Sequence, residues 1–560
     1  MDSCDDMRAP WCAVSASRYF HTVRYLRPVQ VFGRLRFRLI KPRPNLARAP
    51  ALRPLAREAW VAPARRRKAM LAPRRFCFLN VERELASASD WNNPSWQKLW
   101  LYNLHYFDDL NAEGSQARSN WHHPLIQRWI TENPPPEGNA WESYTLSLRI
   151  VNWIKWGIAG NSLSAEALHS LAVQSRYLRR RLEHHLLGNH LFANGKALVF
   201  AGIFFCGDEA DEWLSKGLQI LAREMHEQIL PDGGHFELSP MYHNIILVDV
   251  LDILNLLRIA PDALQLQWES LLLPWRRSAE SMLKWARSVT HPDGDFALVN
   301  DAAFGIASSL AEIERYGSRL GVHGEANHEA VAHLADSGYI RMKIGHAWAL
   351  LDVGRIGPDY LPGHAHADTL SFELSVFGRR VLVDSGTSIY DVGEQRLRQR
   401  STAAHNTVEI NGENSSEVWG SFRVARRAYP LGLELLEGGD IIRVRCAHDG
   451  YKRLSGRPIH CREWTFHNSG LAVNDVVEGA FRNATARFHF HPDCSLVQSD
   501  DRSGFVRLGL DGDIRWCVEA GRPRVVESTY HPEFGLTFRS KSLEVELIGA
   551  RARTLFDWAA

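Results

Sequence analysis

The chain has 560 residues, more than one hydrophobic core usually organises, so two or three domains are expected. Hydrophobic residues make up 45% and charged residues 23%, a composition that excludes a disordered or fibrous protein. The formal net charge of +2 gives the whole chain no steering field for a highly charged partner.

The first 75 residues are rich in arginine, as in Arg34-Leu35-Arg36-Phe37-Arg38 and Arg65-Arg66-Arg67-Lys68. We interpret residues 1–75 as a solvated basic extension with one helix. The alternative is a patch for an anionic polymer or a membrane surface. No recognition motif accompanies the charges, so nucleic acid is not expected as a partner.

The beginning of the sequence carries no readable targeting signal. Residues 1–6 are acidic and lack the basic and apolar regions of a signal peptide. No apolar run is long enough for us to expect a transmembrane segment. The eight cysteines form no Cys-X-X-Cys pair, which indicates neither a zinc ribbon nor a disulfide-dense scaffold.

Residues from about 95 to 320 are predicted to be helical, because leucines recur there at helical intervals without long period-two alternation. Residues 245–259 are almost all apolar, which predicts an inner helix buried on most sides. Trp and Tyr are frequent in this region. We expect most of them in the core and a minority on a floor against which sugar rings stack.

Short strands are predicted after about residue 335. Apolar and polar residues alternate in Phe372–Val376. Asn411-Gly412 and Asn468-Ser469-Gly470 are typical of hairpin turns. These patterns predict an antiparallel β-sandwich.

The segment Gly188-Asn189-His190 contains the first candidate catalytic residues. Gly188 is placed to end one helix, and the next helix is expected from Ala197, so Asn189 and His190 are predicted in a tight, exposed turn. The alternative is that Asn189 only caps a helix and His190 carries no function.

The second segment is Ser239-Pro240-Met241-Tyr242. Serine followed by proline is typical of a helix N-cap and first position, which places Tyr242 in the first helical turn. The helix dipole there favours a phenolate by ~0.3–1 kcal/mol. A phenol, with an ordinary pKa of about 10, is a natural proton donor to a leaving alkoxide. The alternative is a tyrosine that packs against a neighbouring helix.

The third segment, Gly363-His364-Ala365-His366-Ala367-Asp368, precedes a predicted strand at 371–376. A His-X-His pair on a strand directs both imidazoles to one face. Two histidines and one aspartate suit a tetrahedral zinc site with an open position, and Asp384 and His405 follow along the chain. The alternative is a hydrogen-bonded polar cluster on the sheet.

In this order, Asn189-His190, Ser239–Tyr242, Gly363–Asp368, Asp384 and Ala404-His405-Asn406 resemble the motifs of the heparinase II/III-like polysaccharide lyases. The resemblance covers roughly residues 95–560. It implies an incomplete (α/α) toroid followed by an antiparallel β-sandwich. We therefore expect an α+β multidomain protein with three parts: the extension at 1–75, a toroid domain at 76–330 and a β-sandwich domain at 331–560.

The resemblance also implies residue roles. Asn189 would neutralise a uronate carboxylate, assisted by His190, while His364 would be the base and Tyr242 the acid. A structural zinc ion is implied, with three ligands: His366, Asp384 and His405. The expected substrate is an anionic, uronate-containing polysaccharide. The family implies a periplasmic location, whereas the missing signal favours the cytoplasm, so localisation stays open.

The chemistry expected is β-elimination, in which the C5 proton of a uronate is removed and the C4-linked sugar is expelled. Donors held at the carboxylate stabilise the charge that develops there. An imidazole has an ordinary pKa of about 6.5, which suits the base. Positioned acid and base groups each contribute about 10²–10⁴-fold.

Two other functions remain open from the sequence. A glycoside hydrolase needs two carboxylates across a cleft, and Glu142, Glu237 and Asp301 are available in the helical half. A non-catalytic or biosynthetic protein that handles surface polysaccharide is the third hypothesis. The identity of the polysaccharide, endolytic or exolytic action and the oligomeric state are not readable from the sequence.

Overall fold

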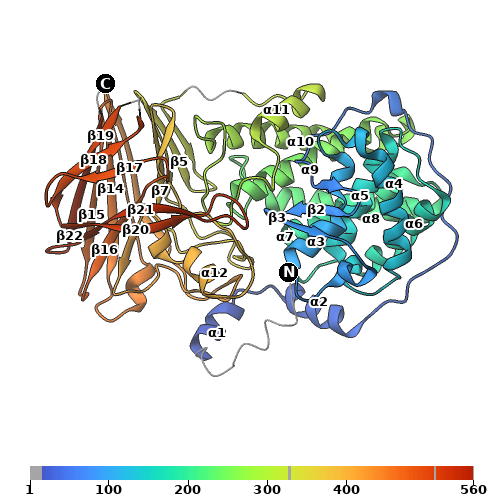
Figure 1. The fold of residues 1–560 in the computed structure, drawn as a ribbon, viewed down its shortest axis with the longest axis horizontal. Helices are drawn as coiled ribbons and strands as arrows, with labels where there is room; N and C mark the ends of the chain where they lie inside the picture. The colour runs from blue at the N-terminus through green and yellow to red at the C-terminus, as the bar shows by residue number, and fades with distance from the viewer. Residues whose placement is uncertain (1–15, 326–328, 510–511, 559–560) are drawn as a thin grey trace.

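The computed structural model describes residues 16–325, 329–509 and 512–558. Figure 1 shows two halves side by side along the long axis, one built of helices and the other of β-sheets. The helices come first in the chain, with one small sheet among them, and the large sheets follow. The predicted α+β architecture is therefore confirmed, while the closure of the helices into an incomplete toroid and the domain boundaries stay predictions.

Long helices form the first half: α3 (Lys98–Tyr106), α4 (Ser119–Glu132), α5 (Ser143–Ile158), α6 (Ala165–Arg180), α7 (Gly188–Phe204), α8 (Asp208–Gln228), α9 (Pro240–Arg258), α10 (Asp262–Ser288) and α11 (Leu310–Arg319). Almost every side chain of α5, α7 and α9 is buried. These three are the inner helices, and α9 is the one that the apolar run at 245–259 predicted.

Within the part of the chain that is described, α9 is also long and apolar enough to cross a membrane by length and composition alone. However, 83% of its most apolar window is buried inside the protein. That burial is what a core helix requires, because the apolar surface is already covered by neighbouring helices.

The basic extension is more structured than the sequence indicates, since it holds two helices, α1 (Ala16–Val23) and α2 (Pro28–Leu39). Pro28 occupies the first position of α2, where a missing N–H costs nothing. A small sheet follows, made of β1 (Met70–Ala72), β2 (Arg75–Phe78) and β3 (Val81–Glu84).

The β half has two layers. One layer is an eight-stranded antiparallel sheet, in the order β12 (Pro430–Gly438), β13 (Ile441–His448), β14 (Ile459–His467), β15 (Gly470–Glu478), β22 (Arg551–Trp558), β19 (Asp513–Ala520), β18 (Ser503–Arg507) and β17 (Ser495–Gln498). The other begins with β4 (Val331–Leu334), β5 (Tyr339–Ile344), β6 (Ala347–Asp352), β7 (Phe372–Val376) and β8 (Arg379–Leu382).

A four-stranded sheet extends the second layer, in the order β20 (Arg522–Tyr530), β21 (Phe538–Glu546), β16 (Ala484–His489) and β9 (Val408–Ile410). It joins β8 through backbone hydrogen bonds from Val383 N to His489 O at 2.9 Å and from His491 N to Val381 O at 3.0 Å. Apolar side chains from all three sheets form one core. The predicted antiparallel sandwich is thus confirmed.

Both predicted hairpin turns are formed, but only one of them joins two long strands. Asn468 and Ser469 connect β14 to β15, which pair along their whole length. Asn411-Gly412 does form a turn, but the strands that follow, β10 (Val418–Trp419) and β11 (Arg423–Val424), pair with each other and not with β9. Glu413 N donates to Ile410 O at 3.0 Å and the two residues form an antiparallel bridge, so the predicted turn is confirmed. The hairpin extends no further because β9 pairs with β16, far along the chain.

The six cysteines in the described residues are free. This agrees with the expectation that the fold is not a disulfide scaffold. Cys4, Cys12 and the acidic start at residues 1–6 lie outside the described residues.

Candidate active site

A cavity of about 570 Å³ lies between the helical half and the β half. All four residues predicted to be catalytic line it: Asn189, His190, Tyr242 and His364. They come from the first turns of α7 and α9 and from the loop that joins β6 to β7. The structure therefore brings together three segments that are separated by up to 175 positions in the sequence.

Asn189 and His190 lie in the first turn of α7, so the prediction of a turn between helices is wrong for this segment. Gly188 begins this helix and does not end the preceding one, which stops at Arg180. The φ angle of Gly188 is +53°, and a Cβ atom there would lie 2.7 Å from Glu237 Oε1. Glycine is therefore required for the backbone to approach this carboxyl group.

Asn189 is 5% exposed and contacts Glu237 twice. Its backbone N–H donates to Oε1 at 3.2 Å, and its side-chain Nδ2 donates to Oε2 at 3.5 Å. His190 is turned the other way, with Nδ1 3.2 Å from Glu183 Oε1 and its ring centroid 4.4 Å from that of Tyr144. The two neighbours thus have separate carboxylate partners.

Tyr242 lies where the sequence predicts, because the Ser239 side chain caps α9 by accepting from Tyr242 N. Its hydroxyl lies 3.3 Å from that of Tyr390. Burial, together with the neighbouring Tyr390, raises the pKa of Tyr242 well above its usual value. The small stabilisation of the phenolate expected from the helix dipole is therefore outweighed by the desolvation of the phenolate.

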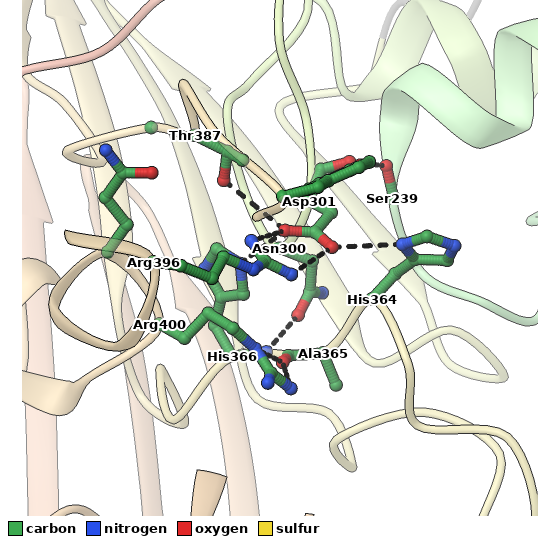
Figure 2. Close-up of polar contacts among 12 residues, drawn as sticks. Ser239, Asn300, Asp301, His364, Ala365, His366, Thr387, Arg396 and Arg400 are labelled. Carbon is green, nitrogen blue, oxygen red and sulfur yellow. Dashed lines mark hydrogen bonds and ion pairs between the residues drawn. The ribbon is translucent and has the colours of Figure 1, made fainter. Parts of the chain in front are cut away.

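His364 lines the cavity. Figure 2 shows one nitrogen of its ring directed at Asp301. His364 Nδ1 lies 3.0 Å from Asp301 Oδ2, while its other nitrogen, Nε2, lies 3.5 Å from Glu237 Oε2. The ring is stacked against Tyr242, with centroids 3.9 Å apart. In a neutral imidazole, donation from Nδ1 to a carboxylate leaves Nε2 as the acceptor nitrogen.

Asp301 is the polar centre of the site, as Figure 2 shows. Its carboxylate contacts His364, His366 at 2.9 Å, Thr387 at 3.4 Å and Arg396, whose Nη2 donates to Oδ2 at 2.7 Å. Burial alone would raise the pKa of Asp301, but Arg396 and the two histidines hold it well below its usual range. A permanent anion therefore anchors both histidines.

The expected His-X-His strand is a loop. Residues 364–368 precede β7, which begins at Phe372. His364 and His366 nevertheless converge, because both rings contact the carboxylate of Asp301 from different sides. His364 lines the cavity, whereas His366 is fully buried behind it.

The predicted metal ligands gather behind the cavity. His405 Nδ1 lies 2.6 Å from Asp384 Oδ2, and the rings of His366 and His405 have centroids 5.2 Å apart. In the described part of the chain, no group of three His, Cys, Asp or Glu side chains is arranged to hold a metal ion as it stands. Two buried ring nitrogens of these described residues, His366 Nδ1 and His405 Nε2, nevertheless lack a hydrogen-bond partner. Imidazole nitrogens of this kind are suitable ligands for a zinc ion.

Four residues of the site had no predicted role in elimination: Glu237, Asp301, Tyr390 and Arg396. The two carboxylates were noted only as candidates for a hydrolase. Arg396 comes from the short helix α12 (Glu394–Gln399), and no local motif marks it. These residues can be recognised only from their contacts in the structure. Each contacts a site residue that is distant in the sequence.

Comparisons with known proteins identify the family of this chain. Two family models match the chain: Heparinase II/III N-terminus over residues 110–318, and Heparinase II/III-like, C-terminal, over residues 326–559. The chain is similar to a heparin-sulfate lyase of Bacteroides stercoris, with 27% identity over 41% of this chain and 37% of that protein. A heparin-sulfate lyase of Pedobacter heparinus is 27% identical to this chain, over 44% of this chain and 40% of the length of that lyase.

These matches span less than half the length of the curated relatives. The fold similarity extends further. A crystal structure of heparinase III superimposes with a TM-score of 0.66 and 19% identity, over 86% of this chain and 78% of the other. Because the two family models together cover most of the sequence and match both halves, the chain belongs to the heparinase II/III family.

Proposed function

We propose that this protein is a polysaccharide lyase that cleaves a uronate-containing polysaccharide by β-elimination. The observation that carries the proposal is the convergence of an amide, a phenol and an imidazole in one cavity, at Asn189, Tyr242 and His364. The heparin-sulfate lyases among its relatives support the same reaction class.

His364 is the proposed base. Its Nδ1 is held by Asp301, so Nε2 faces the cavity and accepts the C5 proton of the uronate. The buried Asp301 carboxylate stabilises the imidazolium that forms, because an opposite charge at hydrogen-bond distance favours the charged ring. Asp301 acts through His364 and is thus a positioning residue.

Tyr242 is the proposed acid. Its raised pKa keeps the phenol protonated before the reaction, which is the form that a proton donor needs. The proton passes from the Tyr242 hydroxyl to the glycosidic oxygen as its bond to C4 of the uronate breaks, and this oxygen leaves as the anomeric hydroxyl group of the expelled sugar. The neighbouring Tyr390 hydroxyl, at 3.3 Å, then solvates the phenolate until it is reprotonated.

Asn189 and Glu237 form the proposed carboxylate pocket. The Asn189 amide can turn from Glu237 to the substrate carboxylate and stabilise the charge that develops there. Burial raises the pKa of Glu237, which favours its neutral form. A neutral carboxyl group beside Asn189 would donate to the uronate instead of repelling it.

We also propose a structural zinc ion held by His366, Asp384 and His405. It would fix the loops that carry His364 and Asp301. The unpaired nitrogens support the two histidine ligands, and Asp384 lies beside them through its 2.6 Å contact with His405 Nδ1. No step of the reaction depends on the ion.

A hydrolase finds less support in the site. Of Glu142, Glu237 and Asp301, only Glu237 lines the cavity. Asp301 is fully buried and bound by Arg396, and Glu142 pairs with Lys98 at 3.0 Å. Two free carboxylates across the cleft, which glycoside hydrolysis needs, are not assembled from this set.

The deciding experiment is incubation with a panel of uronate polymers: sulfated glycosaminoglycans, alginate and bacterial exopolysaccharides. A lyase generates an unsaturated, ultraviolet-absorbing chain end. New reducing ends without that absorbance would instead show a hydrolase. Binding of a polymer without any turnover would show a non-catalytic protein.

A further inference from the structure

We infer that the enzyme acts on the end of its polymer and not within it, because two bridges of polypeptide cross the cleft beside the catalytic residues. This inference rests on the proposed lyase function. The bridges are the N-terminal segment 16–40, called the strap below, and the contact between the β2–β3 turn and the loop at 531–537.

The first helix of the strap, α1, is fastened to the β half. Trp419 Nε1 donates to Thr22 Oγ1 at 3.0 Å, and Arg426 Nη2 donates to Ser17 Oγ at 2.7 Å. Just after α1, the guanidinium group of Arg427 lies over the ring of Tyr25 at 3.7 Å. These contacts involve Trp419 at the end of β10 and two arginines that follow β11.

The second helix of the strap, α2, is fastened to the helical half. Arg181 Nη1 donates to the carbonyl oxygens of Phe37, at 2.5 Å, and Ile40, at 2.8 Å. The ring of Phe37 lies 4.2 Å from that of His185. At Gly33 a Cβ atom would lie 3.1 Å from the backbone nitrogen of His185, so α2 sits directly on this backbone.

The strap therefore spans the cleft from one half to the other, along the lower edge in Figure 1. It also lines the catalytic cavity, through Tyr19, Thr22, Val23, Leu26, Gln30 and Arg34. Gln30 is 5% exposed, and its Nε2 donates to Tyr360 O at 3.1 Å in the loop before His364. The solvated extension predicted from the sequence is thus, in its helical part, a wall of the cavity.

The second bridge crosses nearer the middle of the molecule, where the loop between β20 and β21 meets the small sheet (Figure 1). Asn80 Nδ2 donates to Glu533 Oε2 at 3.0 Å and to Phe534 O at 2.9 Å. Arg67 Nη1 donates to Glu533 Oε1 at 3.0 Å. All four residues line the same cavity as the strap.

An enzyme that cuts within a polymer needs a groove through which the chain runs past the catalytic residues on both sides. Here two sets of cross-domain contacts close the cleft around His364 and Tyr242. An internal segment of the polymer could reach the catalytic residues only if the contacts of both bridges were broken. A chain end can instead enter the cavity between them, and the products are then short and uniform in size.

The test begins with the full-length enzyme on a uronate polymer that it cleaves. Product size is followed by size-exclusion chromatography with ultraviolet detection. We expect short unsaturated products from the first time point, while the remaining polymer keeps its length. A broad ladder of oligosaccharides with early loss of polymer length would overturn the inference but leave the lyase function intact. No unsaturated product from any uronate polymer would overturn both.

Two variants test the strap itself. Gly33→Leu places a side chain against the His185 backbone, and Phe37→Ala removes the ring that packs on His185, so both should release α2. The control is Arg38→Ala, an exposed position on the same helix. Hydrogen exchange over 16–40 verifies release. The released variants should shift towards longer early products, unlike the control. A product profile that stays unchanged after release would overturn the role of the strap.

Discussion

The imidazole ring of His364 and the phenol ring of Tyr242 lie against each other, with centroids 3.9 Å apart and planes inclined by 30°. In β-elimination the base acts at C5 and the acid at the oxygen on C4, which are neighbouring positions on one sugar. A base and an acid in contact can therefore serve the same residue of the polymer. Asp301 fixes the imidazole and Tyr390 contacts the phenol, so the pair is held from both sides.

Replacing the phenol should separate chemistry from binding. Tyr242→Phe removes the proposed proton donor but keeps the ring against His364, so turnover should fall by about 10²–10⁴-fold. Polymer affinity, measured by titration calorimetry, should change little. Tyr390→Phe removes only the neighbouring hydroxyl and should lower turnover less than Tyr242→Phe does. Full activity in Tyr242→Phe would eliminate the proposed acid.

The amide of Asn189 should be needed for the developing negative charge. Asn189→Ala should lower kcat by roughly 10²–10³-fold, as loss of a donor to a developing anion typically does. Asn103→Ala is a matched control, because Asn103 lines the same cavity but donates its amide to Leu99 O at 2.8 Å in its own helix. Equal losses in the two variants would contradict the assignment.

Zinc binding should be visible without any assay of activity. The purified protein should contain zinc by elemental analysis, and His366→Ala or His405→Ala should lose it. A chelator should lower the melting temperature, since an ion that binds only the folded state stabilises it by ~2.7 kcal/mol at a hundredfold excess over Kd. His448→Ala, a buried histidine in a separate cluster with His460, should keep its zinc. Zinc-free protein with an unchanged melting temperature would refute the site.

Acid stability should depend on Asp109, a buried carboxylate that joins the small sheet to the helical half. It accepts hydrogen bonds from Ala69 N, Met70 N, Arg118 and His122 at 2.8–3.0 Å. Burial alone would raise its pKa, but the hydrogen bonds from His122 and Arg118 lower it to about 2. A folded-state pKa below the unfolded value of about 3.9 means that the stabilisation is complete above pH ~4.

This stabilisation, about 2 kcal/mol, should be lost as the pH falls from ~4 through ~2. Asp109→Asn should lower the free energy of unfolding at neutral pH and flatten its pH dependence in that window. Urea unfolding at a series of pH values measures both effects. The exposed Asp262→Asn serves as the control. An unchanged slope below pH ~4 in Asp109→Asn would refute this account.

Much of the scaffold was decided by local sequence. Ser239 and Pro240 set the beginning of α9, and the apolar run that follows made it an inner helix, because capping and hydrophobic periodicity act within a few residues. Alternation at Phe372–Val376 fixed β7 for the same reason. The order of the motifs was likewise enough to indicate the family and the four residues that meet in the cavity.

Tertiary structure alone decided the environment of those residues. The contact of Asp301 with Arg396 joins residues 95 positions apart, and no local pattern marks either partner. The high pKa of Tyr242 follows from burial and from Tyr390, 148 positions away, which override the local helix dipole. The strap was predicted from the sequence as a solvated extension, yet in the folded protein it lines the cavity, because its contacts are with residues far along the chain. Desolvation and long-range contacts depend on which surfaces the fold brings together, and short-range sequence patterns carry no information about that.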